Sequence, residues 1–186
     1  MKLSNPSPWL ILAFVAGIFY PPLVYFGMTV VSPTVLVLVG LALIGVRLLG
    51  LRRNPDNKIW LIALFIAAIV LVVMLFLDAR LATQAYPVVV SLSVSTVFGL
   101  SLLFPPTAVE RIARLTEPNL PPSGVVYTRR VTIVWASVLL ANAGISAATS
   151  MWGTLAEWTL WNGFLSYLLM GTLFIGEIFV RRMVRP

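Results

Sequence analysis

The chain has 186 residues, of which 60% are hydrophobic and only 10% are charged. A soluble domain typically has about 45–50% apolar and about 25% charged residues, so this composition excludes an ordinary soluble domain. The formal net charge is +7, but the basic residues lie between apolar blocks, which is typical of membrane orientation and not of nucleic-acid binding. The chain has neither cysteine nor histidine, which excludes disulfides, thiol catalysis and imidazole metal sites.

Six apolar segments predict transmembrane helices, because a helix needs about 20 apolar residues to span a bilayer. The predicted spans are Trp9–Gly27, Val31–Leu49, Ile59–Leu77, Tyr86–Phe104, Val131–Ser150 and Thr159–Val180. The pair Pro21 and Pro22 is expected to kink the first helix or end it early, and Pro87 lies at the mouth of the fourth. No small-x-small cleavage site follows the first segment, which favours an uncleaved span over a signal peptide. The predicted fold is therefore an all-α polytopic membrane protein with a single integral domain over residues 1–186.

The distribution of basic residues predicts the orientation, because short loops rich in Lys and Arg remain on the cytoplasmic side. With a cytoplasmic N-terminus, only Arg80 lies outside, and the C-terminus is also cytoplasmic. The basic residues of the inner segments are Lys2, Arg47, Arg52, Arg53, Lys58, Arg111, Arg114, Arg129, Arg130, Arg181, Arg182 and Arg185. Trp152, Trp158 and Trp161 are then predicted to lie at the outer interface, where amphipathic rings are favoured.

The longest loop, residues 105–130, is placed on the cytoplasmic side by this orientation. Thr107 and Glu110 match a capping box, which predicts a short amphipathic helix over Thr107–Leu115 on the inner leaflet. The following stretch Glu117–Gly124 contains three prolines and a glycine, so it is expected to form a stiff turn before the fifth span.

Four arginines of this loop are the candidate binding residues for a partner or a lipid headgroup: Arg111, Arg114, Arg129 and Arg130. The simpler interpretation is that the loop is a charged anchor at the membrane surface. The alternative is a docking surface for a cytosolic partner or an acidic headgroup, in which Arg129 and Arg130 hold a phosphate by charge-assisted hydrogen bonds.

Polar residues inside the predicted spans are few. Small residues recur at every fourth position in the fourth span, as Ser91, Ser95 and Gly99, a spacing that favours close helix packing. Asn142 lies in mid-span and is expected to bond to a neighbouring helix, whereas Asn162 is expected near the wet outer end. For Glu177, an ion pair with Arg181 one turn later is the favoured interpretation, and a proton or substrate site is the alternative.

An enzyme is not expected from these residues, because the membrane hydrolases and acyltransferases that rely on histidine are excluded. The inner carboxylates that metal-assisted chemistry would need are scattered without a motif: Asp56, Glu110, Glu117 and Glu177. The chain also lacks a glycine-rich phosphate loop and a protected Ser–Lys pair. We therefore predict no catalytic residue, no metal and no cofactor.

The C-terminal half carries a recognisable pattern. Its motifs are Glu110–Leu115, Leu120-Pro121-Pro122, Tyr127–Thr132 with Trp135, Asn162-Gly163 with Tyr167, and Gly176-Glu177 before the arginine pair. Over about residues 85–182 this pattern resembles a family of small uncharacterised bacterial inner-membrane proteins encoded with aryl-polyene (xanthomonadin-like) biosynthesis genes. The layout is also similar to septation protein A, a small inner-membrane protein of the cell envelope. The resemblance implies a membrane accessory protein of the bacterial inner membrane and assigns no catalytic residue.

Together these observations predict a non-enzymatic inner-membrane scaffold or accessory protein for envelope lipid or aryl-polyene assembly. The alternative is a small transporter or flippase-like carrier of an acyl or polyene lipid, with the face of Ser91, Ser95, Gly99 and Asn142 lining its path. The expected partners are membrane lipids and a cytosolic or membrane protein of acyl-chain or polyene assembly, without nucleic acid. The small-residue spacing is also compatible with helix-mediated oligomers.

Overall fold

The computed structural model describes residues 15–52 and 58–184, and this part of the chain is helical, without a strand. Its elements are α2 (Tyr20–Gly27), α3 (Pro33–Leu51), α4 (Lys58–Leu77), α5 (Ala79–Leu103), α6 (Ala108–Thr116), α7 (Pro122–Trp152), α8 (Leu155–Leu160), the π-helical turn η2 (Trp161–Leu165) and α9 (Ser166–Val184).

Five stretches of the described helices are long and apolar enough to cross a membrane. They are Pro33–Leu51, Trp60–Leu77, Ala79–Leu103, Pro122–Trp152 and Leu155–Met183, the last comprising α8, η2 and α9. The protein is an all-α, multi-pass membrane protein, as the composition predicts.

The first predicted span, Trp9–Gly27, begins outside the described residues. Its described part consists of helical residues 15–18, a turn at Phe19 and the eight-residue helix α2. The helix is interrupted at Phe19, close to the proline pair that was expected to kink it or end it early, and Pro21 and Pro22 occupy the first turn of α2. A proline is tolerated there because the first N–H groups of a helix have no intrahelical acceptor.

Two other predicted boundaries are wrong. Helix α5 begins at Ala79, so Pro87 lies inside the helix and not at its mouth. This early start follows from Asp78, whose carboxylate accepts hydrogen bonds from the backbone N–H groups of Arg80 (2.8 Å) and Leu81 (3.0 Å) and caps the helix. Helix α7 begins at Pro122, so the loop expected over residues 105–130 ends about two turns earlier than predicted.

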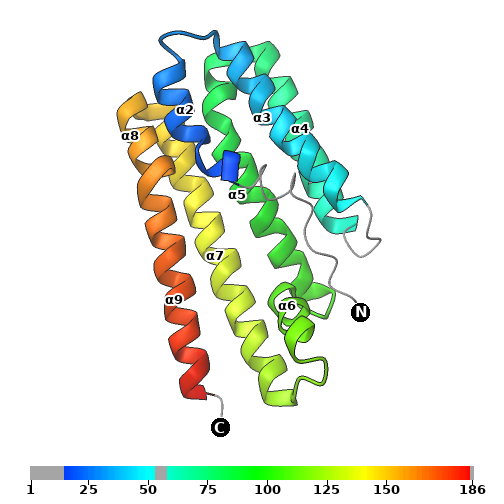
Figure 1. Ribbon diagram of the computed structural model, residues 1–186. Helices are drawn as coiled ribbons and strands as arrows, with labels where there is room; N and C mark the ends of the chain where they lie inside the picture. The colour runs from blue at the N-terminus through cyan, green and yellow to red at the C-terminus, as the bar shows by residue number, and fades with distance from the viewer. Residues whose placement is uncertain (1–14, 53–57, 185–186) are drawn as a thin grey trace.

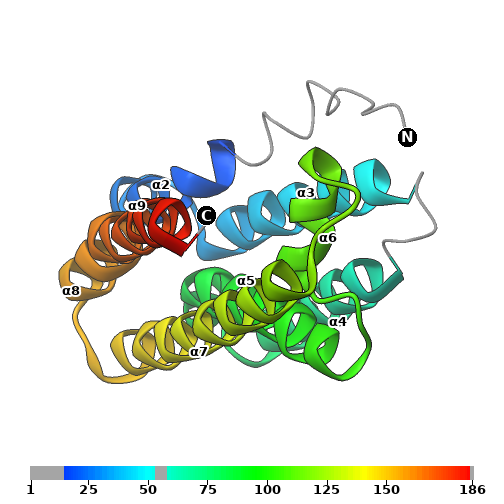
Figure 2. The ribbon, with the colours of Figure 1, turned by 90° about the horizontal axis from the view of Figure 1, so that it is seen from below.

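The long helices alternate in direction along the bundle (Figure 1). We call the end with the α4–α5 and α7–α8 junctions the upper end, and the end with α6 and the last turn of α9 the lower end. Helix α5 is central and packs mainly against α7 and α4, while α3 packs on α4 and α5 (Figure 2). The short helix α2 packs against α3, α5, α8 and η2 in the upper half.

The apolar core lies mainly in the upper half. The fully buried Tyr20 of α2 is at its centre, where its hydroxyl lies within hydrogen-bond distance of the carbonyls of Leu36 (3.2 Å) and Thr83 (3.1 Å). Buried residues packed around it include Val24, Ile44, Leu64, Ala67, Leu71, Tyr86, Val89 and Trp158. Trp158 is completely buried, so its ring packs in the core and does not face the headgroups as predicted, whereas Trp152 is 80% exposed.

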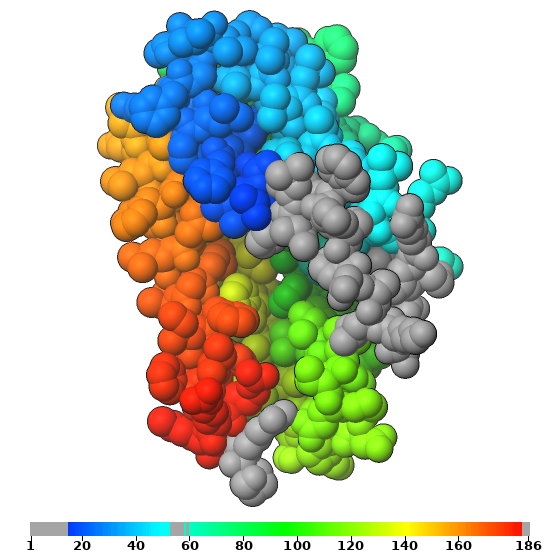
Figure 3. Space-filling model, viewed as in Figure 1, coloured from blue at the N-terminus to red at the C-terminus, as the bar shows by residue number. Residues whose placement is uncertain are grey.

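Helix α9 separates from the bundle below η2. Its main packing contacts within the described chain are with η2, and only 6% of an apolar 18-residue stretch within Leu155–Met183 is buried. In the space-filling view, α9 and α6 stand apart in the lower half of the molecule, with the bundle helices visible between them (Figure 3). This separation leaves the lower half of α7 open on the side facing α9.

Candidate functional site

Asn142 ties three elements together in the upper half of the bundle. Its amide nitrogen donates to Ser91 Oγ on α5 (3.0 Å), and its Oδ1 accepts from Trp161 Nε1 on η2 (3.1 Å). The side chain is buried, as its mid-span position requires. The predicted hydrogen bond to a neighbouring helix is therefore confirmed, and both ends of this amide are occupied.

Asn162 extends the same polar network. Ser146 Oγ donates to Asn162 Oδ1 (2.6 Å), and Asn162 Nδ2 donates to the carbonyl of Trp158 (2.9 Å). Asn162 is only 2% exposed, so the expectation that it is in contact with water is wrong. Sequence spacing could not locate this residue, because η2 interrupts the α-helical repeat at Trp161–Leu165 and turns the side chain towards α7.

The serines of α5 bond across the helix interfaces. Ser95 Oγ donates to the carbonyl of Ala136 on α7 (2.8 Å), and Ser93 Oγ donates to Val89 within α5 (2.6 Å) and lies 3.3 Å from the carbonyl of Ala63 on α4. Close packing was predicted from the four-residue repeat and holds for Ser91 and Ser95. It does not hold for Gly99, because a Cβ added there would meet open space.

Helix α6 is fixed at the lower end by its capped N-terminus. The predicted capping box is present, with hydrogen bonds between Thr107 and Glu110 in both directions. The backbone N–H of Ala108 also donates to Ser101 Oγ of α5 (2.8 Å), and the N–H of Val109 donates to Thr132 Oγ1 of α7 (3.4 Å). Two of the orphan N–H groups of α6 are thus satisfied by side chains of two spanning helices, which hold α6 in place.

The apolar side chains Ile112 and Leu115 of α6 remain 61% and 47% exposed. They lie three residues apart and share the outward side of the helix. The end of the bundle therefore presents a fixed helix whose apolar pair is free to meet a membrane surface or another protein.

Three of the four predicted binding arginines hold backbone carbonyls. Arg111 Nε donates to Pro106 (2.9 Å), and Arg129 Nη1 donates to Leu102 near the C-terminal end of α5 (3.0 Å). Arg114 pairs with Glu110 (Nη2–Oε1 2.7 Å) and donates to Pro118 (3.0 Å).

Arg130 differs from these three arginines. It is exposed, and its guanidinium makes no hydrogen bond or ion pair to the part of the chain that the structure describes. The four arginines therefore do not share one bonded network, and of the four only Arg130 borders the space between α7 and α9.

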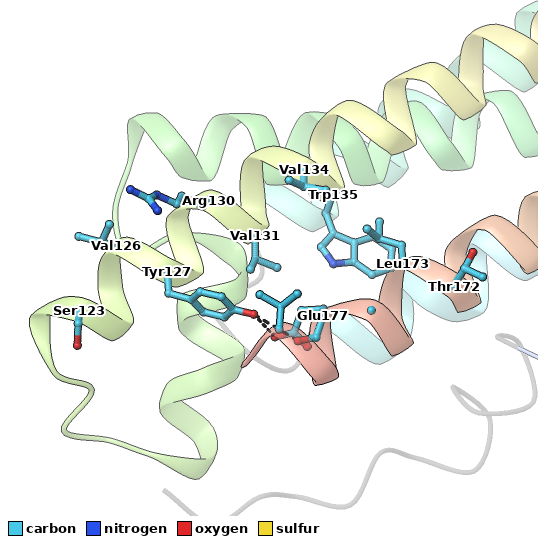
Figure 4. Close-up of a pocket in the computed structure, with 12 residues that line it drawn as sticks. Ser123, Val126, Tyr127, Arg130, Val131, Val134, Trp135, Thr172, Leu173 and Glu177 are labelled. Carbon is cyan, nitrogen blue, oxygen red and sulfur yellow. Dashed lines mark hydrogen bonds between the residues drawn. The ribbon is translucent and has the colours of Figure 1, made fainter. Parts of the chain in front are cut away.

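A groove of about 510 Å³ lies between the lower halves of α7 and α9 (Figure 4). Its walls are largely apolar and include Val126, Val131, Val134, Trp135, Leu173 and Val180. Tyr127 and Trp135 point from α7 towards α9, whereas the guanidinium of Arg130 lies near Val126 at the lower end of the groove (Figure 4). The charged groups Arg130 and Glu177 thus lie in the lower part of the groove, and its upper end is lined by Trp135, Leu173 and Thr172, whose hydroxyl is bonded within α9 (Figure 4).

Glu177 closes part of the space between the two helices. It forms the predicted ion pair with Arg181 (Oε1–Nε 3.6 Å). The hydroxyl of Tyr127 also lies 3.3 Å from both Glu177 Oε1 and the Glu177 carbonyl oxygen. Sequence analysis missed Tyr127 because it assigned this residue to a loop, whereas the early start of α7 brings it opposite Glu177.

The predicted intramembrane polar residues do not form one site. Asn142 belongs to the upper network and Glu177 to the lower groove, and no hydrogen bond joins the two. Within residues 15–52 and 58–184, no group of three or more carboxylates is placed so that it could hold a metal ion. A scan against protein-family models, a search of curated proteins and a search of solved structures each find no match to this chain.

Proposed function

We propose that the protein is a non-enzymatic scaffold or accessory protein of the bacterial inner membrane that serves the assembly of an envelope lipid or aryl polyene. The observation that carries this proposal is the placement of α6, which α5 and α7 hold rigidly while Ile112 and Leu115 remain exposed. A fixed helix with an uncovered apolar pair is suited to docking. The resemblance of residues 85–182 to inner-membrane proteins of polyene clusters supports the choice of pathway.

The charge distribution supports a cytoplasmic lower end. Among the described residues, Arg80 alone of the basic side chains lies near the upper end, while α6 and the lower ends of α7 and α9 are rich in arginine (Figure 1). Short loops with many Lys and Arg residues remain in the cytoplasm. The docking helix α6 would then face the compartment in which acyl chains are built on soluble carriers.

A transporter or flippase-like carrier is the second candidate, and the lateral groove between α7 and α9 is the observation in its favour. A carrier also needs a path through the other half of the bundle. There Ser91 and Asn142, which were expected to line such a path, are buried and bonded to each other. The groove ends below them, so this geometry favours an accessory protein over a carrier.

The docking proposal is tested with the double variant Ile112→Ala/Leu115→Ala. The matched control is Ile62→Ala/Ile66→Ala on α4, where the side chains are 60% and 54% exposed. Each variant replaces the chromosomal copy, and the envelope lipid or polyene extracted from the cells is quantified at equal protein level. Product should fall several-fold in the α6 variant and stay at the parent level in the control. Equal product from both variants would show that α6 is not the working surface.

The carrier alternative is tested with purified protein in vesicles that contain a fluorescent lipid. The rate at which labelled lipid crosses the bilayer is measured with a membrane-impermeant quencher, in protein-free and protein-containing vesicles. An accessory protein should leave this rate unchanged. A protein-dependent rate that Asn142→Ala alters would support the carrier and contradict the scaffold.

A further inference from the structure

The groove between α7 and α9 has the dimensions of a site for one hydrocarbon chain. Ser123 and Trp135, at its two ends, are separated by about 18 Å along α7 at 1.5 Å per residue. One leaflet supplies about 15 Å of hydrocarbon, half of the roughly 30 Å core of a bilayer. The groove therefore matches the depth of a single leaflet.

The volume of the groove fits a hydrocarbon chain. The groove holds about 510 Å³, which lies within the range of about 300–1,000 Å³ typical of small-molecule sites. An acyl chain is a ligand of this class, and the largely apolar walls favour it over a polar molecule.

The charge at the groove's lower end indicates the headgroup. Arg130 lines this end with its guanidinium uncommitted among the described residues, and Arg181 and Arg182 are exposed on the last turn of α9. The carboxylate of Glu177, which lines the groove, already accepts a hydrogen bond from Tyr127 and forms an ion pair with Arg181. The excess charge is positive, and a guanidinium binds phosphate oxygens by two parallel hydrogen bonds.

We propose that the α7–α9 groove binds one acyl chain of an anionic phospholipid, with the headgroup phosphate at Arg130 and the chain extending past Val131 and Val134 towards Trp135. The apolar end of the groove, where Leu173 faces Trp135, receives the end of the chain. The ligand comes from the surrounding leaflet, because both walls of the groove belong to helices long and apolar enough to span a membrane. This site does not depend on α6 or on the scaffold proposed above.

The chain offers matched controls for both parts of the site. Arg129 is adjacent to Arg130, but its guanidinium is bound to the Leu102 carbonyl. Gly176 lines the groove and Gly171 does not, yet a Cβ added at either glycine of α9 would meet open space. Gly176→Leu therefore fills the groove without a backbone clash, and Gly171→Leu makes the same change in the same helix outside it.

The test uses the full chain in vesicles of phosphatidylcholine that contain a trace of phospholipid with a photoreactive acyl chain. The probe carries either a phosphatidylglycerol or a phosphatidylcholine headgroup, and labelled peptides are identified by mass spectrometry. The parent should be labelled mainly at Val131–Trp135 and Leu173, and roughly fivefold more by the anionic probe. Both headgroups carry a phosphate, but the choline cation of phosphatidylcholine is repelled by the guanidinium of Arg130. Gly176→Leu should lose groove labelling with both probes, and Gly171→Leu should retain it.

The headgroup assignment is tested separately. Arg130→Ala should abolish the preference for the anionic probe while labelling by the phosphatidylcholine probe remains, and Arg129→Ala should keep the preference. A preference that survives Arg130→Ala would overturn the role of Arg130. Labelling spread equally over all lipid-facing helices, or groove labelling unchanged by Gly176→Leu, would overturn the site itself. So would crosslinked dimers formed through the groove. Far-UV circular dichroism and gel filtration of each variant ensure that only folded protein is compared.

Discussion

Ser146 of α7 donates a 2.6 Å hydrogen bond to Oδ1 of Asn162 in the π-helical turn η2. Both side chains are buried, and the amide nitrogen of Asn162 donates to the Trp158 carbonyl. This bond fixes the point where α9 leaves the bundle, so the shape of the lower groove depends on a polar contact in the upper half.

The first prediction concerns the energy of this contact. In a double-mutant cycle of Ser146→Ala and Asn162→Ala, we expect a coupling of about 0.5–1.5 kcal/mol, the range found for hydrogen bonds between membrane helices. Asn162→Ala alone should cost more than Ser146→Ala, because it also leaves the Trp158 carbonyl without this donor. The measurement is unfolding by a denaturing detergent in mixed micelles. Additive effects of the two substitutions would mean that the bond contributes nothing.

The second prediction uses two glycines with different surroundings. A Cβ added at Gly163 would lie 3.3 Å from Pro22 Cδ and 3.6 Å from Pro21 Cβ of α2, whereas at Gly171 it would meet open space. Gly163→Leu should therefore destabilise the protein by about 1–3 kcal/mol through overpacking. Gly171→Ala should stabilise it by roughly 0.5–1 kcal/mol, because alanine is a better helix former. Detergent unfolding curves give both values, and an equal effect of the two variants would show that α2 does not pack on η2.

The third prediction concerns the bridge between α7 and α9. Tyr127→Phe removes the hydroxyl that contacts Glu177 and should widen the distribution of α7–α9 distances. The chain has no cysteine, so spin labels at Ile133→Cys and Phe179→Cys report this distance by pulsed electron paramagnetic resonance. Tyr25→Phe, on an exposed tyrosine of α2, is the control and should change nothing. An unchanged distribution in Tyr127→Phe would rule out the bridge as a restraint on α9.

The fourth prediction separates a structural from a functional role for Glu177. Glu177→Gln removes the charge that pairs with Arg181 but keeps an oxygen that accepts from Tyr127. A partly exposed i,i+4 ion pair contributes about 0.3–0.5 kcal/mol, so stability and envelope product should stay close to the parent. Near-total loss of product at normal expression would support the proton or substrate site instead.

The fifth prediction concerns topology. The structure places Ala79 and Gly153 at the upper end and Glu117 at the lower end (Figure 1). If the lower end is cytoplasmic, reporter fusions after Glu117 and Met183 should give cytoplasmic signals, and fusions at Ala79 and Gly153 should give external signals. A cytoplasmic signal at Gly153 would contradict the orientation, because α7 would then fail to cross the membrane.

Composition and local pattern were sufficient for much of this molecule. The apolar runs predict all five spans found in the described residues, since hydrocarbon requires every backbone group to be satisfied within a helix. The Thr107–Glu110 capping box and the pairing of Glu177 with Arg181 were also predictable, because both involve residues three or four apart on one helix. These features depend on contacts within one element, which a sequence contains directly.

Only the tertiary structure decided which side chains meet across helices. The π-helical turn buries Asn162 and Trp158, and the early start of α7 brings Tyr127 opposite Glu177. Arg129 and Arg130 are neighbours in sequence, yet one is bound to the end of α5 and the other lines the groove. Helical spacing predicts the face that a residue shares with its neighbours, but a shift of one residue along the helix moves that face by about 100°. Such shifts arise from packing between helices, and for that reason the sequence alone determined the spans while the structure decided the groove.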